Sequence, residues 1–430
     1  MPLRIRYLDV RRIINKLKID AEKKNIFSNF IFLFLLQIAN YLLPLLTVPY
    51  LVRTIGIANV GLLAFAGAVC TYFQIITDFG FNLSATRQVS INRSNKSILN
   101  EIYSSVIYIK IMLSIFCFIA LLGLLEIVPQ FKENKLVFIL TYIGVFGQSL
   151  FPVWLFQGLE RMRYITFINV GIKVLFTLSI FILINKPDDY IYVPALTSVS
   201  MVLSGIIAML VIFVNFNISL QIVKFDIIGK YFKDGWHIFT SRVFSSLYKN
   251  SAVLILGFFT THQVTGYYSV AEKIIRSLQT LQNVIGDALY PHLVKSFHDG
   301  KYSYNDFSRK YKWIVTIAYV CMALCVLVFS DIAAKIFVGV AYHQVSINIK
   351  IMSLIIFFGG LNYYYGILGL VALNYKKEFS RYVLITGIVS IISMIIFSVL
   401  YEDVGASIVS VLSEFLLLVL ILNKLRKIKA

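Results

Sequence analysis

The chain alternates between long apolar segments and short polar connections. A helix needs about 20 apolar residues to cross a bilayer, so each long segment is read as one membrane span. The chain is 59% hydrophobic, well above the roughly 45–50% of soluble domains. The pattern predicts an all-α polytopic membrane protein. Its twelve transmembrane helices are expected near residues 27–51, 60–80, 102–126, 136–157, 164–185, 193–215, 237–259, 265–290, 313–338, 349–372, 383–400 and 405–423.

The positive charges of the connections lie mainly on one side of these spans. Of the Lys and Arg residues, 28 fall on the side of the amino terminus and 6 on the other side. Because basic loops stay in the cytoplasm, both termini are expected there. The net charge of +19 therefore reflects membrane orientation and does not indicate a nucleic-acid partner. Residues 1–26 form an amphipathic basic tail, and residues 424–430 form a second basic tail.

An internal repeat divides the chain into two halves. Leu51–Ala66 and Leu256–Ala271 both pass from one span across a short outer loop into the next, with Gly61 aligned to Gly266. Six spans per half make the repeat parallel. We expect an amino-terminal lobe over residues 27–215, a cytoplasmic linker over 216–236 and a carboxyl-terminal lobe over 237–423. A central cavity between the two lobes is expected.

Two of the expected spans, 237–259 and 265–290, carry polar stripes at helical spacing. Charged side chains at the bilayer centre cost about 2.5–3.5 kcal/mol on insertion scales, so they face water or a partner charge. Stripes that face each other would enclose a water-filled cavity that is mostly cationic. The substrate-binding candidates are the six Lys and Arg residues that fall inside spans: Arg242, Lys249, Lys273, Arg276, Lys110 and Lys173.

A sharper motif lies at the inner end of the second span. It reads Asp78-Phe79-Gly80-Phe81 and continues to Ala85-Thr86-Arg87, with the Gly61–Ala66 segment upstream. The chain resembles the Wzx-type polysaccharide and O-antigen flippases of the multidrug/oligosaccharidyl-lipid/polysaccharide exporter superfamily. Gly266–Ala271 looks like the corresponding element of the second half.

This resemblance implies a two-lobed fold like that of the multidrug and toxin extrusion transporters. It implies a flippase that moves an undecaprenyl-pyrophosphate-type oligosaccharide from the inner to the outer leaflet by alternating access. The location would be the bacterial inner membrane, and the product would enter surface polysaccharide or lipopolysaccharide assembly. Partners would be the lipid-linked oligosaccharide, a polysaccharide polymerase and chain-length machinery. The coupling ion, H⁺ or Na⁺, stays open, with Glu272, Asp287 and Asp78 as candidate residues.

Two interpretations of Asp78 remain open. Its carboxylate could form an inner gate with Arg87, or a site for the lipid pyrophosphate. Alternatively, it could end its helix in a salt bridge to a nearby Arg.

The sequence argues against catalysis. It has no nucleotide-binding phosphate loop, no metal-ligand spacing and no nucleophile triad, so we expect no cofactor and no enzymatic activity. A cation-coupled multidrug antiporter of the same superfamily is the first alternative function. A membrane-embedded glycosyltransferase or polymerase is the second, and the short outer loops disfavour it.

Overall fold

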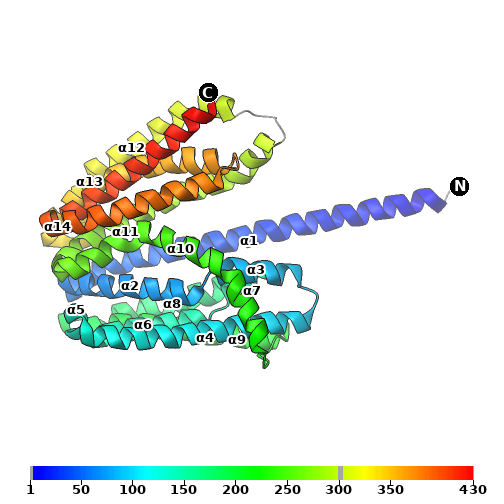
Figure 1. Ribbon diagram of the computed structural model, residues 1–430, viewed down its shortest axis with the longest axis horizontal. Coiled ribbons are helices and arrows are strands. Elements are labelled where there is room, and N and C mark those ends of the chain that lie inside the picture. Colours follow the sequence, from blue (N-terminus) through cyan, green and yellow to red (C-terminus); the bar gives the residue numbers. More distant parts are fainter. Residues whose placement is uncertain (1–2, 299–303, 430) are drawn as a thin grey trace.

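The computed structural model describes residues 3–298 and 304–429, except for the side chains of residues 3–27 and of scattered positions that lie mostly between 241 and 298. The described residues form helices almost throughout and include no β-strand (Figure 1). The first half contains α1 (Leu3–Ile55), α2 (Ile57–Asp78), α3 (Phe81–Ile91), α4 (Lys96–Ile127), α5 (Pro129–Lys132), α6 (Lys135–Leu150), α7 (Val153–Gly158), α8 (Met162–Leu183), the 3-10 helix η1 (Pro187–Ile191) and α9 (Tyr192–Phe216). The second half contains α10 (Phe225–Phe259), α11 (His262–His298), α12 (Tyr304–Val338), the 3-10 helix η2 (Gly339–Ala341), α13 (Tyr342–Asn362), the π-helix η3 (Tyr363–Val371) and α14 (Lys376–Lys429).

Within the described residues, nine helices are long and apolar enough to cross a membrane. One of them is α14, where Glu402 leaves the helical conformation (φ 50°, ψ −131°) and divides the helix into two arms. This break lies between the expected spans 383–400 and 405–423. The helices α10 and α11 cover the two expected spans with polar stripes and are not among the nine. A multi-pass helical membrane protein is confirmed, and the number twelve stays a prediction.

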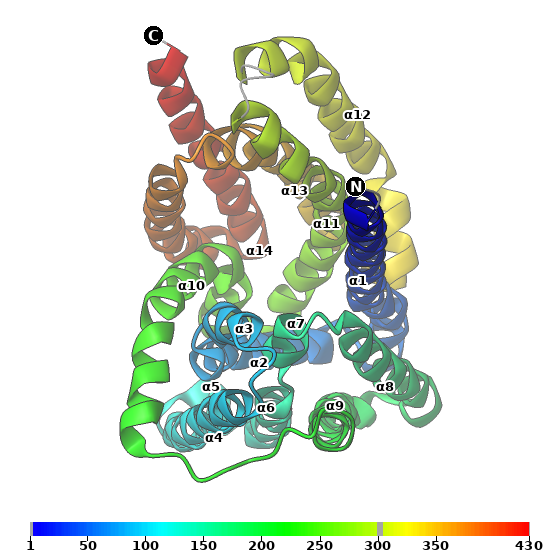
Figure 2. The same ribbon diagram turned by 90° about the vertical axis from the view of Figure 1, so that its right-hand side faces the viewer.

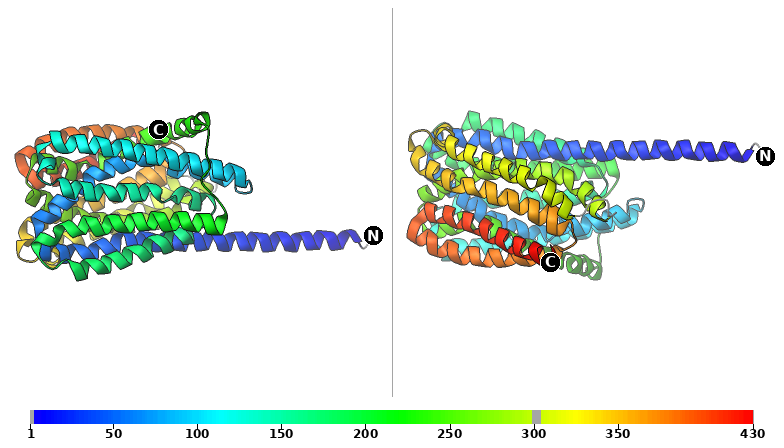
Figure 3. Two further views of the ribbon diagram at one scale, coloured as in Figure 1. Left: turned by 90° about the horizontal axis from the view of Figure 1, so that it is seen from below. Right: turned by 90° about the horizontal axis from the view of Figure 1, so that it is seen from above.

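The helices gather into two groups that are joined at one end. One group holds α2 to α9, and the other holds α11 to α14 (Figure 1). In this view the groups converge at the end away from the chain termini and spread apart toward the end that carries both termini. Figure 2 looks at the molecule from that spread end. The predicted amino-terminal tail and first span form one continuous helix, α1, whose first part projects beyond all other helices (Figure 3).

The two groups meet where α2 packs against α11. A Cβ atom on Gly61 would lie 1.8 Å from the carbonyl oxygen of His262, and a Cβ on Gly266 would lie 2.3 Å from that of Ile57. Only glycine permits two backbones to approach so closely. These are the two glycines aligned by the internal repeat. Equivalent residues beside a twofold axis are expected to meet in this way.

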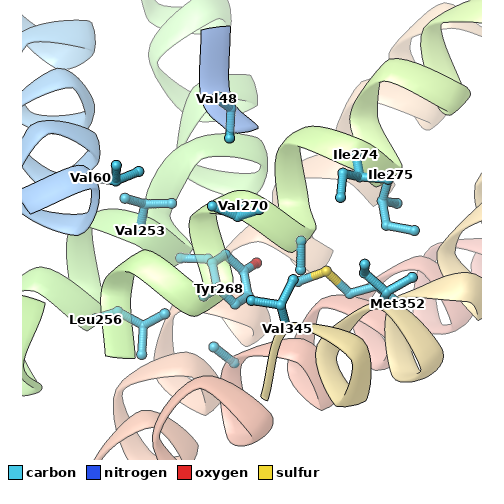
Figure 4. Packing of buried hydrophobic residues seen from close by; sticks show 14 of the residues in the cluster. Val48, Val60, Val253, Leu256, Tyr268, Val270, Ile274, Ile275, Val345 and Met352 are labelled. Carbon is cyan, nitrogen blue, oxygen red and sulfur yellow. The ribbon is translucent and has the colours of Figure 1, made fainter. Parts of the chain in front are cut away.

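Apolar side chains surround this glycine contact. Val48 of α1, Val60 of α2, Val253 of α10 and Val270 of α11 belong to one buried cluster, which α13 extends (Figure 4). In a bilayer such contacts are stabilised by van der Waals packing, since the surrounding lipid is as apolar as the side chains themselves. The junction between the groups is therefore a packed core drawn from both halves of the chain.

We expect Gly61→Ala to destabilise the protein, because the new methyl group would overlap the backbone of α11. Forcing extra atoms into a packed interior costs ~1–3 kcal/mol. Gly67→Ala on the same helix is the matched control, since a Cβ there meets nothing within 4 Å. Thermal unfolding of the purified protein in detergent measures both variants. Equal melting temperatures for the two would contradict the tight contact.

Candidate functional site

A cavity of about 450 Å³ lies within the second group of helices, and its wall includes both apolar and charged side chains. Its wall comes from α10, α11, α13, η3 and α14, and Tyr41 of α1 reaches it from the first half of the chain. Among the described lining residues the charged ones are Glu272, Arg276 and Glu414. Its volume falls in the range of about 300–1,000 Å³ that is usual for small-molecule sites. This cavity is the candidate functional site.

Glu272 and Arg276 stand one turn apart on α11 and form an ion pair. The guanidinium donates from Nε (2.9 Å) and from Nη2 (2.7 Å) to the same oxygen of Glu272, Oε1. The Arg276 side chain is 38% exposed, whereas that of Glu272 is 17% exposed. The sequence placed both on the polar stripe of this helix. The structure brings them together at the cavity wall.

Glu414 of α14 was missed by the sequence reasoning. The amide nitrogen of Asn362 donates to its carboxylate oxygen Oε2 (2.7 Å) and to its backbone carbonyl (2.8 Å). An acid within the apolar segment 405–423 is itself a signal of function, since ionisable groups at membrane depth are rare and costly. The cavity therefore holds two carboxyl groups, of which the sequence analysis had named one.

The other candidate residues on α10 and α11 are less well placed. Arg242 is partly exposed on α10 and makes no hydrogen bond or ion pair with any other described residue. Lys273 is exposed and is not among the described residues that line the cavity. The side chains of Lys249 and Asp287 lie outside the described part of the structure.

Lys110 and Asp78 form a buried ion pair in the first group of helices. The ammonium of Lys110 lies 2.9 Å from Oδ1 of Asp78, and the two side chains are 2% and 16% exposed. The partner of Asp78 is thus a lysine of α4 and not a nearby arginine. Arg87 is exposed on α3, past the turn that ends α2 at Asp78.

Lys173 is also held by a neighbour. Its ammonium donates to Oδ1 of Asn40 at 2.7 Å, which joins α8 to α1. Snorkelling to the surface is therefore not needed to satisfy this charge. Neither Lys110 nor Lys173 is among the described residues lining the cavity, so both bind other parts of the protein in this conformation.

The Asp78–Phe81 turn connects the first group of helices to α10. Phe79 and Gly80 both have left-handed backbones (φ 41° and 77°), which ends α2 and starts α3. The ring of Phe79 stacks on Phe232 (4.2 Å between centroids) and on Phe239 (4.6 Å). The motif thus positions an aromatic contact with the beginning of α10.

These features define a polytopic helical protein of the transporter type. In its described residues no group of His, Cys, Asp and Glu could hold a metal ion. The fold is similar to that of "Lipid II flippase MurJ, inward closed conformation", with a TM-score of 0.71, 13% identity, and coverage of 93% of this chain and 87% of that one. It is also similar to an inward-facing multidrug resistance MATE family transporter of the MOP superfamily. There the TM-score is 0.66 and the identity 12%, with coverage of 90% of this chain and 98% of that one.

The family described as "Polysaccharide biosynthesis protein" matches residues 26–297, and the chain belongs to this family. A "Putative O-antigen transporter" of Escherichia coli (strain K12) is 30% identical over 95% of this chain and 99% of its own length. A protein of the same name from Shigella dysenteriae is 29% identical over 73% of this chain and 78% of its own length. The expected relationship to polysaccharide flippases is confirmed. With such relatives, the chain is a membrane transporter and not an enzyme.

Replacing Lys110 with Met should destabilise the protein strongly, because Asp78 would keep a buried charge without its partner. Removing one member of a buried pair costs ~3–5 kcal/mol. The double variant Lys110→Met with Asp78→Asn should recover part of the loss. Lys135→Met is the matched control, since Lys135 pairs with Glu126 at an exposed position of the same group of helices. Thermal unfolding in detergent compares them, and an Lys110→Met protein as stable as the control would refute a structural ion pair.

Proposed function

We propose that this protein is a flippase for a lipid-linked oligosaccharide. It moves an undecaprenyl-pyrophosphate-type repeat unit from the inner to the outer leaflet of the bacterial inner membrane, for surface polysaccharide assembly. The observation that carries the proposal is a cavity with charged side chains within a helical bundle, in a chain that belongs to a polysaccharide biosynthesis family. A polar cavity at membrane depth gives hydrophilic sugars a route that lipid denies them.

Alternating access is the proposed mechanism. We propose that residues 27–215 and 237–423 act as two lobes that rotate about the contact between α2 and α11. With both termini in the cytoplasm, as the basic loops suggest, the spread end of the molecule faces the cytoplasm (Figure 1). The structure would then represent the state that receives substrate from the inner leaflet.

The anionic head group is proposed to bind the cationic side chains of α10 and α11. Arg242, Lys249 and Arg276 are the proposed contacts, because a guanidinium can hold phosphate oxygens through two parallel hydrogen bonds. Arg242 supports this role, since it has no ion pair among the described residues. Arg276 would bind the anion while it keeps Glu272 beside it.

An antiporter for organic cations is the second candidate function. The observation that favours it is the excess of carboxyl groups over guanidinium groups among the described cavity residues. Cations are attracted to carboxylates and to aromatic faces. Family membership favours the flippase. The phenotype of a deletion strain distinguishes the two candidate functions.

Deleting the gene should leave lipid-linked repeat units on the cytoplasmic leaflet and abolish surface polysaccharide. The reason is that a hydrophilic sugar head group cannot cross the apolar core of the bilayer without a transporter. Extraction of lipid-linked intermediates and immunological detection of surface polysaccharide measure the two effects. Normal polysaccharide in a null strain without a redundant flippase would eliminate this function, and altered drug resistance alone would favour the antiporter.

Arg276→Ala should abolish export while the protein still inserts and folds, and Arg276→Lys should restore export only in part. Lysine keeps the positive charge but lacks the planar guanidinium group, whose donors can form two parallel hydrogen bonds to one anion. Arg309→Ala is the matched control, since Arg309 is exposed on α12. Export in the null strain, normalised to membrane protein level, is the measurement.

Wild-type export by the Ala variants of Arg242, Lys249 and Arg276 would exclude the cationic contact. Glu272→Gln, tested in the same strain and in vesicles with and without an H⁺ or Na⁺ gradient, separates ion coupling from anion binding. Uptake that responds to the gradient as in the wild type would exclude coupling through Glu272. Asp287→Asn and Asp78→Asn apply the same test to the other two carboxylates.

A further inference from the structure

The chain between α9 and α10 forms an extended segment, residues 217–224, which we call the strap. The helix α9 ends at Phe216, and Asn217 has a left-handed backbone (φ 51°) that turns the chain away from the helix axis. Asparagine is one of the few residues with a side chain that adopts this conformation readily. The strap contains neither helix nor strand, and α10 begins directly after it at Phe225.

Three side chains of α4 hold the strap in place. Oδ1 of Asn100 accepts a hydrogen bond from the backbone nitrogen of Ser219 (3.1 Å). Gln221 is held twice, since its backbone nitrogen donates to Oγ of Ser104 (2.8 Å) and its carbonyl accepts from the hydroxyl of Tyr108 (3.1 Å). The three side chains are four residues apart and lie on one face of α4, about 6 Å from one to the next. Alternate residues of an extended chain are about 6.6 Å apart, so the two spacings match.

The first part of α10 is also fixed to the first group of helices. Seen from the spread end, it runs along the outer edge of that group (Figure 2). Tyr231 is buried, and its hydroxyl donates to Oε1 of Glu101 (3.2 Å). The ring of Phe232 stacks on Phe79, and a Cβ atom on Gly235 would lie 2.8 Å from the carbonyl oxygen of Phe79. One face of this part of α10 is therefore packed against protein.

The other side of the strap and of early α10 exposes large apolar side chains. Ile222 is fully exposed and Phe225 is 90% exposed, while Leu220 and Trp236 are about half exposed. Phe225 and Trp236 are eleven residues apart, about three helical turns, so they lie on the same side of α10. A contiguous apolar surface of this kind marks contact with another protein or with lipid.

The charged residues of the same segment favour lipid as the occupant. Lys224, Lys230 and Lys233 are exposed. Of the two acids, Asp234 accepts a hydrogen bond from an amide of α3 (3.4 Å), and Asp226 lies in the first turn of α10, where the helix dipole favours a negative charge. Aromatic and aliphatic side chains with lysines beside them are typical of helices that lie at a membrane surface.

The position of the strap along the chain points to the same occupant. The span that precedes it keeps a lipid-facing surface up to its last turn, where Phe213 and Val214 are exposed. The strap begins three residues after Val214, so the apolar surface of the span continues into it at the edge of the bilayer. A surface turned toward the cytoplasm would leave these side chains in water.

We propose that residues 220–236 form an anchor on the surface of the inner leaflet. The four exposed apolar side chains enter the bilayer at the level of the head groups, and the three lysines bind phosphate oxygens of phospholipids. The linker 216–236, expected in the cytoplasm, thus lies on the membrane. Because α10 continues from the anchor to Phe259 and packs against α14, the anchor ties the second group of helices to the membrane surface. This inference goes beyond the proposed function and does not depend on the substrate.

Tryptophan fluorescence of the full-length protein in phospholipid nanodiscs tests the anchor. Subtracting the emission of Trp236→Phe from that of the wild type isolates Trp236 and keeps the buried Trp154 in place. Phe225→Trp gives a second reporter on the same face. Both reporters should lose intensity when the acyl chains carry bromine near the head groups, and both should be shielded from iodide in water. Ser94→Trp is the matched control, since Ser94 is exposed in the turn between α3 and α4. It should show the opposite pattern.

Replacing the apolar side chains should release the anchor from the bilayer. In Ile222→Ser combined with Phe225→Ser, quenching of Trp236 by brominated lipid should fall and quenching by iodide should rise, because the apolar attraction to the bilayer is lost. The two side chains are exposed, so their replacement leaves the packed face of α10 intact. Ile91→Ser is the matched control, since Ile91 is an exposed apolar residue at the end of α3 and outside the anchor. It should leave both kinds of quenching unchanged.

Three outcomes would overturn the anchor. The first is quenching of Trp236 and of Phe225→Trp by iodide and not by brominated lipid, which would place this face in water. The second is quenching by neither, which would mean that a protein covers the face. The third is unchanged quenching of Trp236 in the double Ser variant. None of these measurements uses export, so their failure would leave the flippase function untouched, and a null strain with normal polysaccharide would leave the anchor untouched.

Discussion

A charge at membrane depth must have a partner or water, and this constraint determines where the ionisable residues of this protein lie. The ammonium of Lys110 is paired with Asp78, and that of Lys173 is bonded to Asn40. The buried carboxylate of Asp403 accepts hydrogen bonds from the amides of Gln344 and Asn348. Glu272, Arg276 and Glu414 differ from these groups because they line a cavity. The same physical cost thus separates structural charges from those that can receive a ligand.

This distinction also sets how far the sequence could predict the structure. The apolar segments and the basic loops identified the helical fold, because each is a local property of the chain. Spacing along α11 likewise predicted that Glu272 and Arg276 share one face. The partner of Asp78 could not be predicted in this way, since Lys110 is 32 residues away on another helix. The role of Glu414 depends in the same way on Asn362 of α13, and periodicity carries no information about packing between helices.

The contact between Gly61 and Gly266 links the fold to the site. It holds the two groups of helices together at one end, so that they can diverge at the other. Tyr41 is the described cavity residue that comes from the first half of the chain. A rotation about the glycine contact would move α1 relative to α11 and α14, and Tyr41 with it. Such a rotation would therefore change the wall of the cavity through this side chain.

The pairing of Glu272 with Arg276 puts a hydrogen-bond acceptor and a donor side by side at the cavity wall. Phosphate oxygens need donors, which guanidinium and ammonium groups provide. Sugar hydroxyls can both donate and accept hydrogen bonds. A wall made only of cations would bind the pyrophosphate tightly but would leave the sugars bound to water. A wall made only of acids would repel the lipid carrier. Because Arg276 and Glu272 form an ion pair one turn apart on α11, a movement of this helix would carry the donor and the acceptor together.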